Sequence, residues 1–153
     1  MNANTLLSEL GTLMGVGGLQ FDEQGCARLV FDGAVTLNLE HEAGSSRLQI
    51  YSVLGKVPLE DREHVYQLLL EGNLFGAETG GAVLAIDGLE NEIVLFRTLE
   101  GDGITGVAFA EVVGHFVDAA EDWAARLAGA SMTAPGARQD VEHEGHASSM
   151  IRA

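Results

Sequence analysis

The stretch that decides the fold runs from Leu59 to Gly88 and reads LEDREHVYQLLLEGNLFGAETGGAVLAIDG. Its first part has an acidic start and apolar residues at helical spacing, which predicts a helix that ends near Glu71. Gly72-Asn73 is the kind of pair found where a helix exits through a left-handed residue. Ala82 to Ile86 is a short apolar run, and Asp87-Gly88 can supply the positive φ of a turn. We therefore expect a helix, a glycine-rich turn and a buried strand in close succession.

Toward the N-terminus, the sequence predicts one helix. Residues 4–15 carry an apolar stripe that Asn4 or Thr5 can cap, and a glycine run that begins at Gly15 ends it. Gly11 lies inside the stripe, where it is either a weak point of the helix or a point of close approach.

Between this helix and the central stretch, apolar residues recur at every second position from Cys26 to Leu54, which predicts strands. Asp32-Gly33 is a hairpin signal between the first two strands, and residues 42–46 form the turn before the third, Arg47 to Leu54. We expect an antiparallel three-stranded meander with one apolar face and one mixed face.

After the central stretch, the sequence predicts a second hairpin and the longest helix. Glu92 to Leu99 alternates in polarity and pairs most simply with Ala82 to Ile86. An apolar stripe then runs from Phe109 to Leu127 and predicts a helix. The pattern stops at Gly129, which divides the chain into a globular domain, residues 1–129, and a flexible tail, residues 130–153.

The order of elements is helix, three strands, helix, two strands, helix. Strands in runs, joined by hairpins and separated by helices, are typical of the α+β class and not of a parallel doubly wound sheet. We expect a twisted antiparallel sheet with helices packed on it.

The charge balance is the one compositional outlier, with 8 Lys and Arg against 23 Asp and Glu and a formal net charge of −15. A nucleic-acid partner is disfavoured, because binding to phosphates requires clustered basic residues. The acidity is explained either by solubility or by a surface that complements a basic partner.

The location of the protein is predicted from what the sequence lacks. No apolar run approaches the roughly 20 residues of a membrane helix, and Met1 to Thr5 has no basic start of a secretory signal. The single cysteine, Cys26, cannot form an internal disulfide and is read as a strand residue rather than a reactive thiol. We expect a cytoplasmic protein without membrane insertion.

Two motifs that suggest chemistry are better explained as structure. Gly101 to Gly106 is a literal G-x-G-x-x-G, but the predicted helix after it leads into no further strand, and Glu100 and Asp102 would repel a pyrophosphate. His143 and His146 fall in the predicted flexible tail, which cannot fix the ligands of a metal ion. Neither a nucleophile motif nor a metal-ligand spacing is present, so we expect no catalytic residue, no cofactor and no metal.

The helices and strands carry more apolar surface than one small core can cover. The helix that ends near Glu71 has apolar residues around much of its surface, which a symmetric dimer contact would bury. A helix sunk in the core of a monomer is the alternative.

At several places the sequence resembles the Tir chaperone (CesT-type) family, the class I chaperones of bacterial type III secretion. The residues that carry the resemblance span nearly the whole predicted domain, and the stretch from Asn73-Leu74 to Gly80-Gly81-Ala82 is the most specific. The full set comprises Leu6 to Gly11, Leu29 to Asp32, Leu68 to Gly76, Thr79 to Asp87, Phe116 and Trp123.

The resemblance implies an α+β homodimer without enzymatic activity that holds the N-terminal region of a secreted effector extended until the secretion apparatus takes it. An extended guest can add a strand at a sheet edge and place apolar side chains in grooves, without ATP. Our hypothesis for the effector-binding residues is Leu6, Leu10, Leu13, Leu29 and Phe31. Our hypothesis for the dimer interface is Val65, Leu68, Leu69, Leu84 and Ile86.

Two other functions remain open at the level of sequence. One is a dimeric adaptor of the same fold that does not serve secretion, and the other is a small acidic enzyme whose site assembles only in three dimensions.

Overall fold

The structure is a computed structural model that describes residues 2–132. Residues 130–132 of the predicted flexible tail belong to the last helix, and the rest of that tail lies outside the described residues. In chain order, the elements are α1 (Ala3–Leu13), β1 (Cys26–Phe31), β2 (Val35–His41), β3 (Arg47–Lys56), α2 (Arg62–Gly72), the 3₁₀ turn η1 (Leu74–Gly76), β4 (Val83–Asp87), β5 (Glu92–Glu100) and α3 (Gly106–Met132). The predicted order and the α+β class are confirmed.

All five strands form one antiparallel sheet in the order β1-β2-β3-β5-β4. The meander and the second hairpin join because β5 pairs with β3 from Arg47↔Glu100 to Lys56↔Glu92. This arrangement leaves β1 and β4 as the two edge strands.

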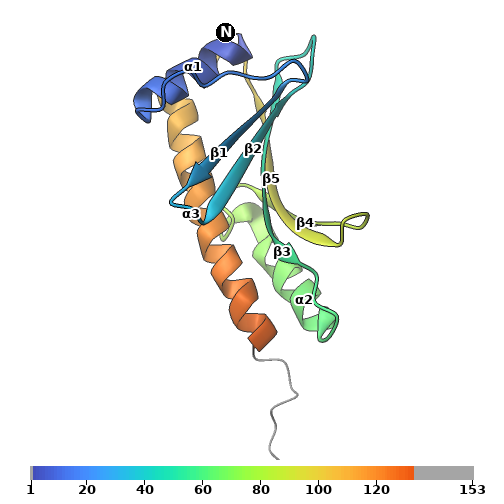
Figure 1. Ribbon diagram of the computed structural model, residues 1–153. Coiled ribbons are helices and arrows are strands. Elements are labelled where there is room, and N and C mark those ends of the chain that lie inside the picture. The colour runs from blue at the N-terminus through green and yellow to red at the C-terminus, as the bar shows by residue number, and fades with distance from the viewer. Residues whose placement is uncertain (1, 133–153) are drawn as a thin grey trace, which may run out of the picture.

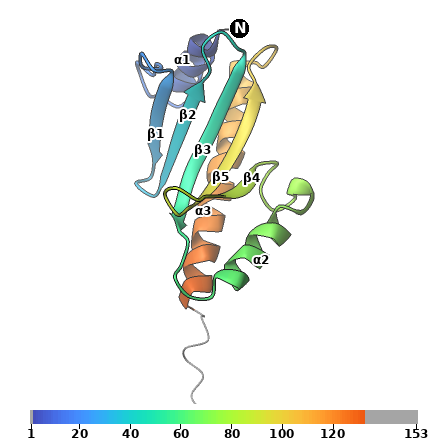
Figure 2. The same ribbon diagram turned by 90° about the vertical axis from the view of Figure 1, so that its right-hand side faces the viewer.

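α1 and α3 lie on one side of the sheet, and α2 lies at its lower end near the edge strand β4 (Figure 1). α3 crosses behind the strands and α1 packs against its N-terminal part, whereas α2 lies beside the C-terminal half of α3 (Figure 2). We call the covered side the inner face and the side toward the viewer in Figure 2 the outer face. The predicted difference between an apolar face and a mixed face is confirmed.

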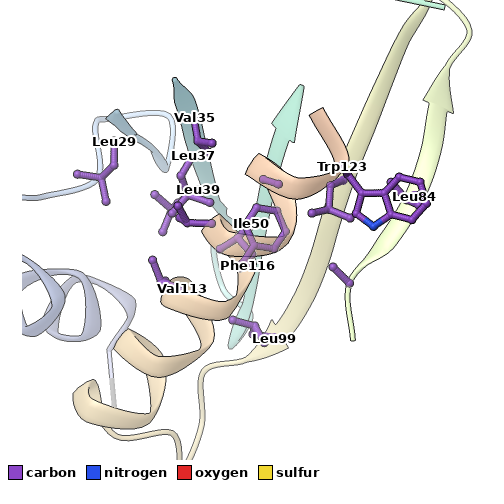
Figure 3. Close-up of a cluster of buried hydrophobic side chains, with 14 of the residues drawn as sticks. Leu29, Val35, Leu37, Leu39, Ile50, Leu84, Leu99, Val113, Phe116 and Trp123 are labelled. Atoms are coloured by element: carbon purple, nitrogen blue, oxygen red, sulfur yellow. The ribbon is translucent and has the colours of Figure 1, made fainter. Parts of the chain in front are cut away.

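The core fills the space between the inner face and α3 (Figure 3). Its buried strand residues include Leu29, Leu37, Leu39, Ile50, Leu84 and Leu95, and its buried α3 residues include Phe109, Val113, Phe116, Ala120 and Trp123. The alternation along β2 follows from the period of two, since Val35, Leu37 and Leu39 are buried while the residues between them are partly exposed.

Gly11 marks a close approach, not a weak point. A β-carbon at this position would lie 2.6 Å from the carbonyl oxygen of Val16 and 3.0 Å from the Leu19 β-carbon. The turn after α1 therefore folds back onto the helix at this glycine.

Three local predictions are wrong. The side chain of Asn2, not of Asn4 or Thr5, caps α1, because its Oδ1 accepts a hydrogen bond from the backbone N–H of Asn4 at 3.0 Å. The chain turns left-handed after α2 at Phe75, with φ +55°, and not at Gly72-Asn73.

The third error concerns the turn after β4. The strand ends at Asp87 as predicted, but Asn91 takes the positive φ, at +57°. A positive φ at Gly88 is not required. The Asp87 carboxylate stabilises the turn instead, because it accepts hydrogen bonds from the N–H groups of Leu89 and Glu90 at 2.9 and 3.3 Å. The Asp32-Gly33 hairpin is antiparallel as predicted, with positive φ at both residues, but its loop also includes Ala34.

Candidate functional site

The two edges of the sheet differ in how their backbone hydrogen-bonding groups are used. At β4, the side-chain amide of Asn73 donates from Nδ2 to the carbonyl of Leu84 at 2.9 Å and accepts at Oδ1 from the N–H of Leu84 at 2.8 Å. A single side chain thus satisfies both groups that this residue directs away from β5. The chain itself closes the β4 edge at Leu84.

Asn73 reaches β4 because α2 ends directly against the core. A β-carbon on Gly72 would collide with the buried ring of Trp123, so only glycine lets the helix approach this closely. Trp123 in turn lies beside Leu84 (Figure 3) and donates its indole N–H to the carbonyl of Glu78 at 2.9 Å. The turn between α2 and β4 is therefore held at two points, by the bonds of Asn73 to β4 and by the bond of Glu78 to Trp123 on α3.

At β1, the first position of the edge is closed as well. The carboxylate of Asp22 accepts the N–H of Cys26 at 2.8 Å, and the N–H of Asp22 donates to the carbonyl of Cys26 at 2.8 Å. Antiparallel pairing with β2 alternates, so Arg28 and Val30 also direct their N–H and C=O groups away from β2. No partner for these groups lies within residues 2–132. We call the outward backbone groups of Arg28 and Val30 the open edge.

The open edge is bordered by apolar side chains. Leu29 is buried, and Ala27 and Phe31 are half-buried beside it on the inner face. On the outer face, Val30 exposes 61% of its surface. A strand that paired with β1 would meet apolar side chains on the inner face and at Val30.

The outer face next to the open edge is polar and hollowed. A cavity of 370 Å³ is lined by Gln20, Asp22, Cys26, Ala27, Arg28, Asn38, Leu39, Glu40 and Tyr51. The Tyr51 hydroxyl donates to Glu40 at 2.9 Å, and partial burial together with this bond to a carboxylate raises the pKa of Tyr51 to about 12. Burial and the neighbouring Asp22 and Glu40 raise the pKa of Cys26, which argues against a reactive thiolate.

The predicted effector-binding residues differ in exposure. Leu6 and Leu10 have no exposed surface, because α1 packs them into the core, and Leu29 is also buried. Leu13 is 55% exposed at the end of α1, and Phe31 is half-buried at the end of β1. Only Leu13 and Phe31 offer appreciable surface to a guest without rearrangement of the chain.

The predicted dimer residues lie on α2 and β4, which pack against each other. Val65, Leu69 and Leu84 are largely buried within the chain, Leu68 is half-buried and Ile86 is exposed. A cavity of 320 Å³ between the two elements is lined by Tyr66, Leu69, Leu70, Asn73, Leu84, Ala85 and Ile86. The structure thus brings Leu69, Leu84 and Ile86 together at one apolar hollow.

The G-x-G-x-x-G segment has structural roles. The N–H of Gly101 donates to the carbonyl of Ser46 at 2.7 Å, which ties the end of β5 to the turn before β3. The side chain of Glu9 occupies the space where a β-carbon on Gly106 would lie, at the start of α3. Across residues 2–132 there is no group of three potential metal-ligating side chains.

Residues 5–124 match the sequence profile of the Tir chaperone protein (CesT) family. The chain belongs to this family. A protein of Chlamydia pneumoniae is 30% identical over 123 residues, which are 80% of this chain and 93% of that protein. The predicted resemblance is confirmed.

Solved structures share the fold of this CesT-family chain. A chain of the ExsC–ExsE complex matches with a TM-score of 0.68 and 23% identity, covering 82% of this chain and 96% of its own. The Yersinia pestis type III secretion chaperone SycH, in complex with a fragment of YscM2, matches with a TM-score of 0.63 and 23% identity, covering 79% and 98%. YbjN of E. coli, a putative transcription regulator, matches with a TM-score of 0.55 and 17% identity, covering 86% and 94%.

The residues that distinguish the two edges of the CesT-family chain were not identified from sequence. Asn73 belongs to its most specific stretch, but the pattern indicated a helix exit and gave no sign of a bond to β4. Asp22 lies in a segment without a periodic signal, and the alternation from Cys26 to Leu54 places Arg28 on a strand without indicating that this strand is an open edge. An aspartate four residues before a predicted strand is the one available hint at a capped strand start.

None of the helices within residues 2–132 combines the length and hydrophobicity needed to span a bilayer.

Proposed function

We propose that this chain is a class I type III secretion chaperone that binds the N-terminal region of a secreted effector and keeps it extended and secretion-competent. The observation that carries the proposal is the open edge of β1 with its apolar border. An extended segment gains backbone hydrogen bonds at Arg28 and Val30 and buries side chains against Phe31 and Val30. Membership of the CesT family supports this reading over an unrelated binding module.

Holding by this surface needs no chemistry. Strand addition and apolar burial act by mass action, so the bound fraction depends on the concentrations of guest and chaperone. We infer that the protein has no catalytic activity and acts in the bacterial cytoplasm, where a guest waits before export.

The proposal is tested by deleting the gene and comparing the secreted proteins of the two strains. The expected result is the loss of one or a few secreted proteins, restored by the wild-type gene. An unchanged set of secreted proteins would contradict the secretion role. It would favour an adaptor of the same fold that does not serve secretion. YbjN, which its structure describes as a putative transcription regulator, has a similar fold.

The open edge is tested by two matched substitutions. Val30→Asp places a charge on the open edge, and Val107→Asp places the same charge on α3 at an equally exposed site, since the side chains are 61% and 60% exposed. We expect Val30→Asp to reduce the co-purified effector about tenfold or more, because an unpaired charge is costly to bury. Val107→Asp should retain it. Equal retention by both variants would contradict the assignment of the edge.

We further propose that the chain forms a homodimer through the hollow between α2 and β4. Leu70 lies at this hollow with 73% of its surface exposed and forms a continuous apolar patch with Tyr66 and Ile86, which a partner would cover. An isologous contact would bring the same hollow of two copies together and add Leu68 and Ile86 to the buried surface. The contact surface would rest on three buried side chains beneath it, those of Val65, Leu69 and Leu84.

Sedimentation tests the dimer with another matched pair. Leu70→Asp is expected to convert a dimer into a monomer of 16.1 kDa. Leu89→Asp, at a 96% exposed site in the turn after β4 and outside the hollow, should leave the dimer intact. A dimer that survives Leu70→Asp would contradict this interface.

A further inference from the structure

The open edge admits only a short strand, which constrains the guest that the proposed function requires. The hydrogen bonds between Asp22 and Cys26 occupy the first outward position of β1, and Phe31 begins the turn to β2. Arg28 and Val30 are the outward positions left between them. A guest strand therefore has two positions at which to pair, and its register on β1 is restricted.

Arg28 stands out among the basic residues of the chain. Within residues 2–132, the other Lys and Arg side chains have hydrogen-bond or ion-pair partners: Arg47, Lys56, Arg62, Arg97 and Arg126. Arg28 has no such partner in that range, although the chain carries 23 acidic residues. Its side chain lies on the outer face in the row Arg28, Asn38, Tyr51 and Phe96.

The two carboxylates of the neighbouring cavity are engaged elsewhere. Asp22 accepts the N–H groups of Gln24 and Cys26, at 2.9 and 2.8 Å, and Glu40 accepts the hydroxyl of Tyr51. Neither forms an ion pair with Arg28, so the guanidinium keeps its five donors for another group.

We propose that the open edge binds an extended guest segment in which an acidic side chain lies opposite Arg28, with apolar side chains on the inner face at either side of it. This inference rests on the proposed function and names the chemistry of the guest at that site. Side chains directly opposite across an antiparallel pair lie close enough to interact, and a carboxylate is the natural partner of a guanidinium.

An acidic guest accounts for Arg28 better than protection of the edge or self-pairing does. A charge on an edge strand can simply prevent aggregation, but an acidic residue would do so equally well in a chain of net charge −15. Pairing of β1 with β1 of a second copy gives the guanidinium no carboxylate, because it places Arg28 opposite Arg28 when centred on residue 28 and opposite Val30 when centred on residue 29. An acidic guest gives Arg28 a partner of opposite charge, which neither alternative does.

The test uses the full chain and three synthetic probes in which only one residue differs. The probes are acetyl-Ser-Leu-Thr-Leu-Xaa-Leu-Ser-amide with Glu, Gln or Lys at Xaa, so that an antiparallel probe with Xaa opposite Arg28 places its Thr opposite Val30, and they are titrated at about 0.15 M salt, where long-range charge effects are screened. Backbone amide NMR signals report the site. We expect the signals of Arg28 and Val30 to shift, those of Cys26 to stay, and the Glu probe to bind roughly two- to fivefold more tightly than the Gln probe.

Variants decide whether Arg28 is responsible. Arg28→Gln should abolish the preference for the Glu probe, and Arg28→Glu should reverse it toward the Lys probe. Arg62→Gln removes the same charge on α2 and should leave the preference unchanged. Equal binding of the Glu and Gln probes, a preference that persists in Arg28→Gln, or displacement of the probes by a peptide of residues 133–153 would overturn the inference.

These outcomes are separable from the test of secretion. If the deletion strain loses a secreted protein but the probes show no preference, the proposed function stands and this inference fails. If the probes bind as expected while the secreted proteins are unchanged, the edge recognises acidic strands in a role other than secretion.

Discussion

The β4 edge and the β1 edge belong to the same sheet, yet the chain protects the outward backbone groups of β4 over more of the strand than those of β1. At β4, the amide of Asn73 bonds both outward groups of Leu84, and α2 lies alongside the strand. At β1, Asp22 and Cys26 close one position and leave those of Arg28 and Val30 without partners within residues 2–132. Natural sheets usually protect their edges, so an edge left open beside a protected one indicates a place for a partner.

The comparison also separates the two proposed contacts of the molecule. The β4 side has little backbone to offer at Leu84, and its exposed surface consists of apolar side chains such as Leu70 and Ile86. The β1 side offers backbone groups with an apolar border. A globular copy that buries side chains fits the first, and an extended segment that needs hydrogen bonds fits the second.

The largest expected effect comes from opening the closed edge. Asn73→Ala removes both hydrogen bonds to Leu84 and leaves its nearly buried N–H and C=O groups unsatisfied. We expect a loss of about 2–4 kcal/mol in the free energy of unfolding, measured by urea denaturation. Leu74→Ala, one residue away at an exposed site, is the control and should change stability by less than about 0.5 kcal/mol. A wild-type-like Asn73→Ala would mean that the amide does not close this edge.

The next effect concerns the approach of α2 to the core, on which the position of Asn73 depends. Gly72→Ala drives a methyl group into the ring of Trp123, which is buried and held by its bond to Glu78. We expect a loss of about 1–3 kcal/mol, seen as a lower melting temperature. Gly114→Ala in α3, where nothing lies near the added carbon, should instead stabilise by about 0.5–1 kcal/mol. Stabilisation of the protein by both substitutions would contradict the close approach of Gly72 to the Trp123 ring.

A smaller effect is expected at the stop on the β1 edge. Asp22→Ala removes the acceptor for the N–H groups of Gln24 and Cys26, at a cost of about 1 kcal/mol. Asp22→Asn keeps an acceptor oxygen and should behave like the wild type. Hydrogen exchange of the Cys26 amide checks this, since it should accelerate in Asp22→Ala alone. Unchanged exchange would show that Asp22 does not limit the open edge.

The smallest effect concerns the outer face beside that edge. The pKa of Tyr51 is raised to about 12, above its ordinary value of 10.0, so the folded chain holds this proton more tightly than the unfolded chain. Its contribution to stability is therefore complete below pH 10 and is lost as the pH rises through about 12. Denaturation between about pH 9 and 11.5 should show a decline in stability that Tyr51→Phe reduces. An equal decline in the variant would rule out the bond to Glu40 as its source.

The elements of the fold could be predicted because each has a strong period or a turn signal. The strands from Cys26 to Leu54 alternate, and the helix at Phe109 to Leu127 repeats its apolar residues at helical spacing. The pairing of β5 with β3 could not be predicted, since the way in which the meander and the second hairpin join depends on how both pack on α3.

The candidate site was only partly accessible to sequence reasoning. Apolar residues that face a partner and those that face the core have the same character, so Leu6, Leu10 and Leu69 were selected together with the exposed Leu13. The difference between the edges depends on Asn73, which crosses from α2 to β4, and on Asp22, which folds back on β1. Such side-chain to backbone bonds have no periodic pattern and appear only in three dimensions.

Hydrogen exchange of backbone amides, with and without a bound effector, tests the contrast between the edges most directly. In the free protein, we predict slow exchange at Leu84 and fast exchange at Arg28 and Val30. With the effector bound, Arg28 and Val30 should become protected while Leu84 is unchanged. Fast exchange at Leu84, protection of Arg28 and Val30 before an effector is added, or an effector that leaves both exchanging freely would contradict the account.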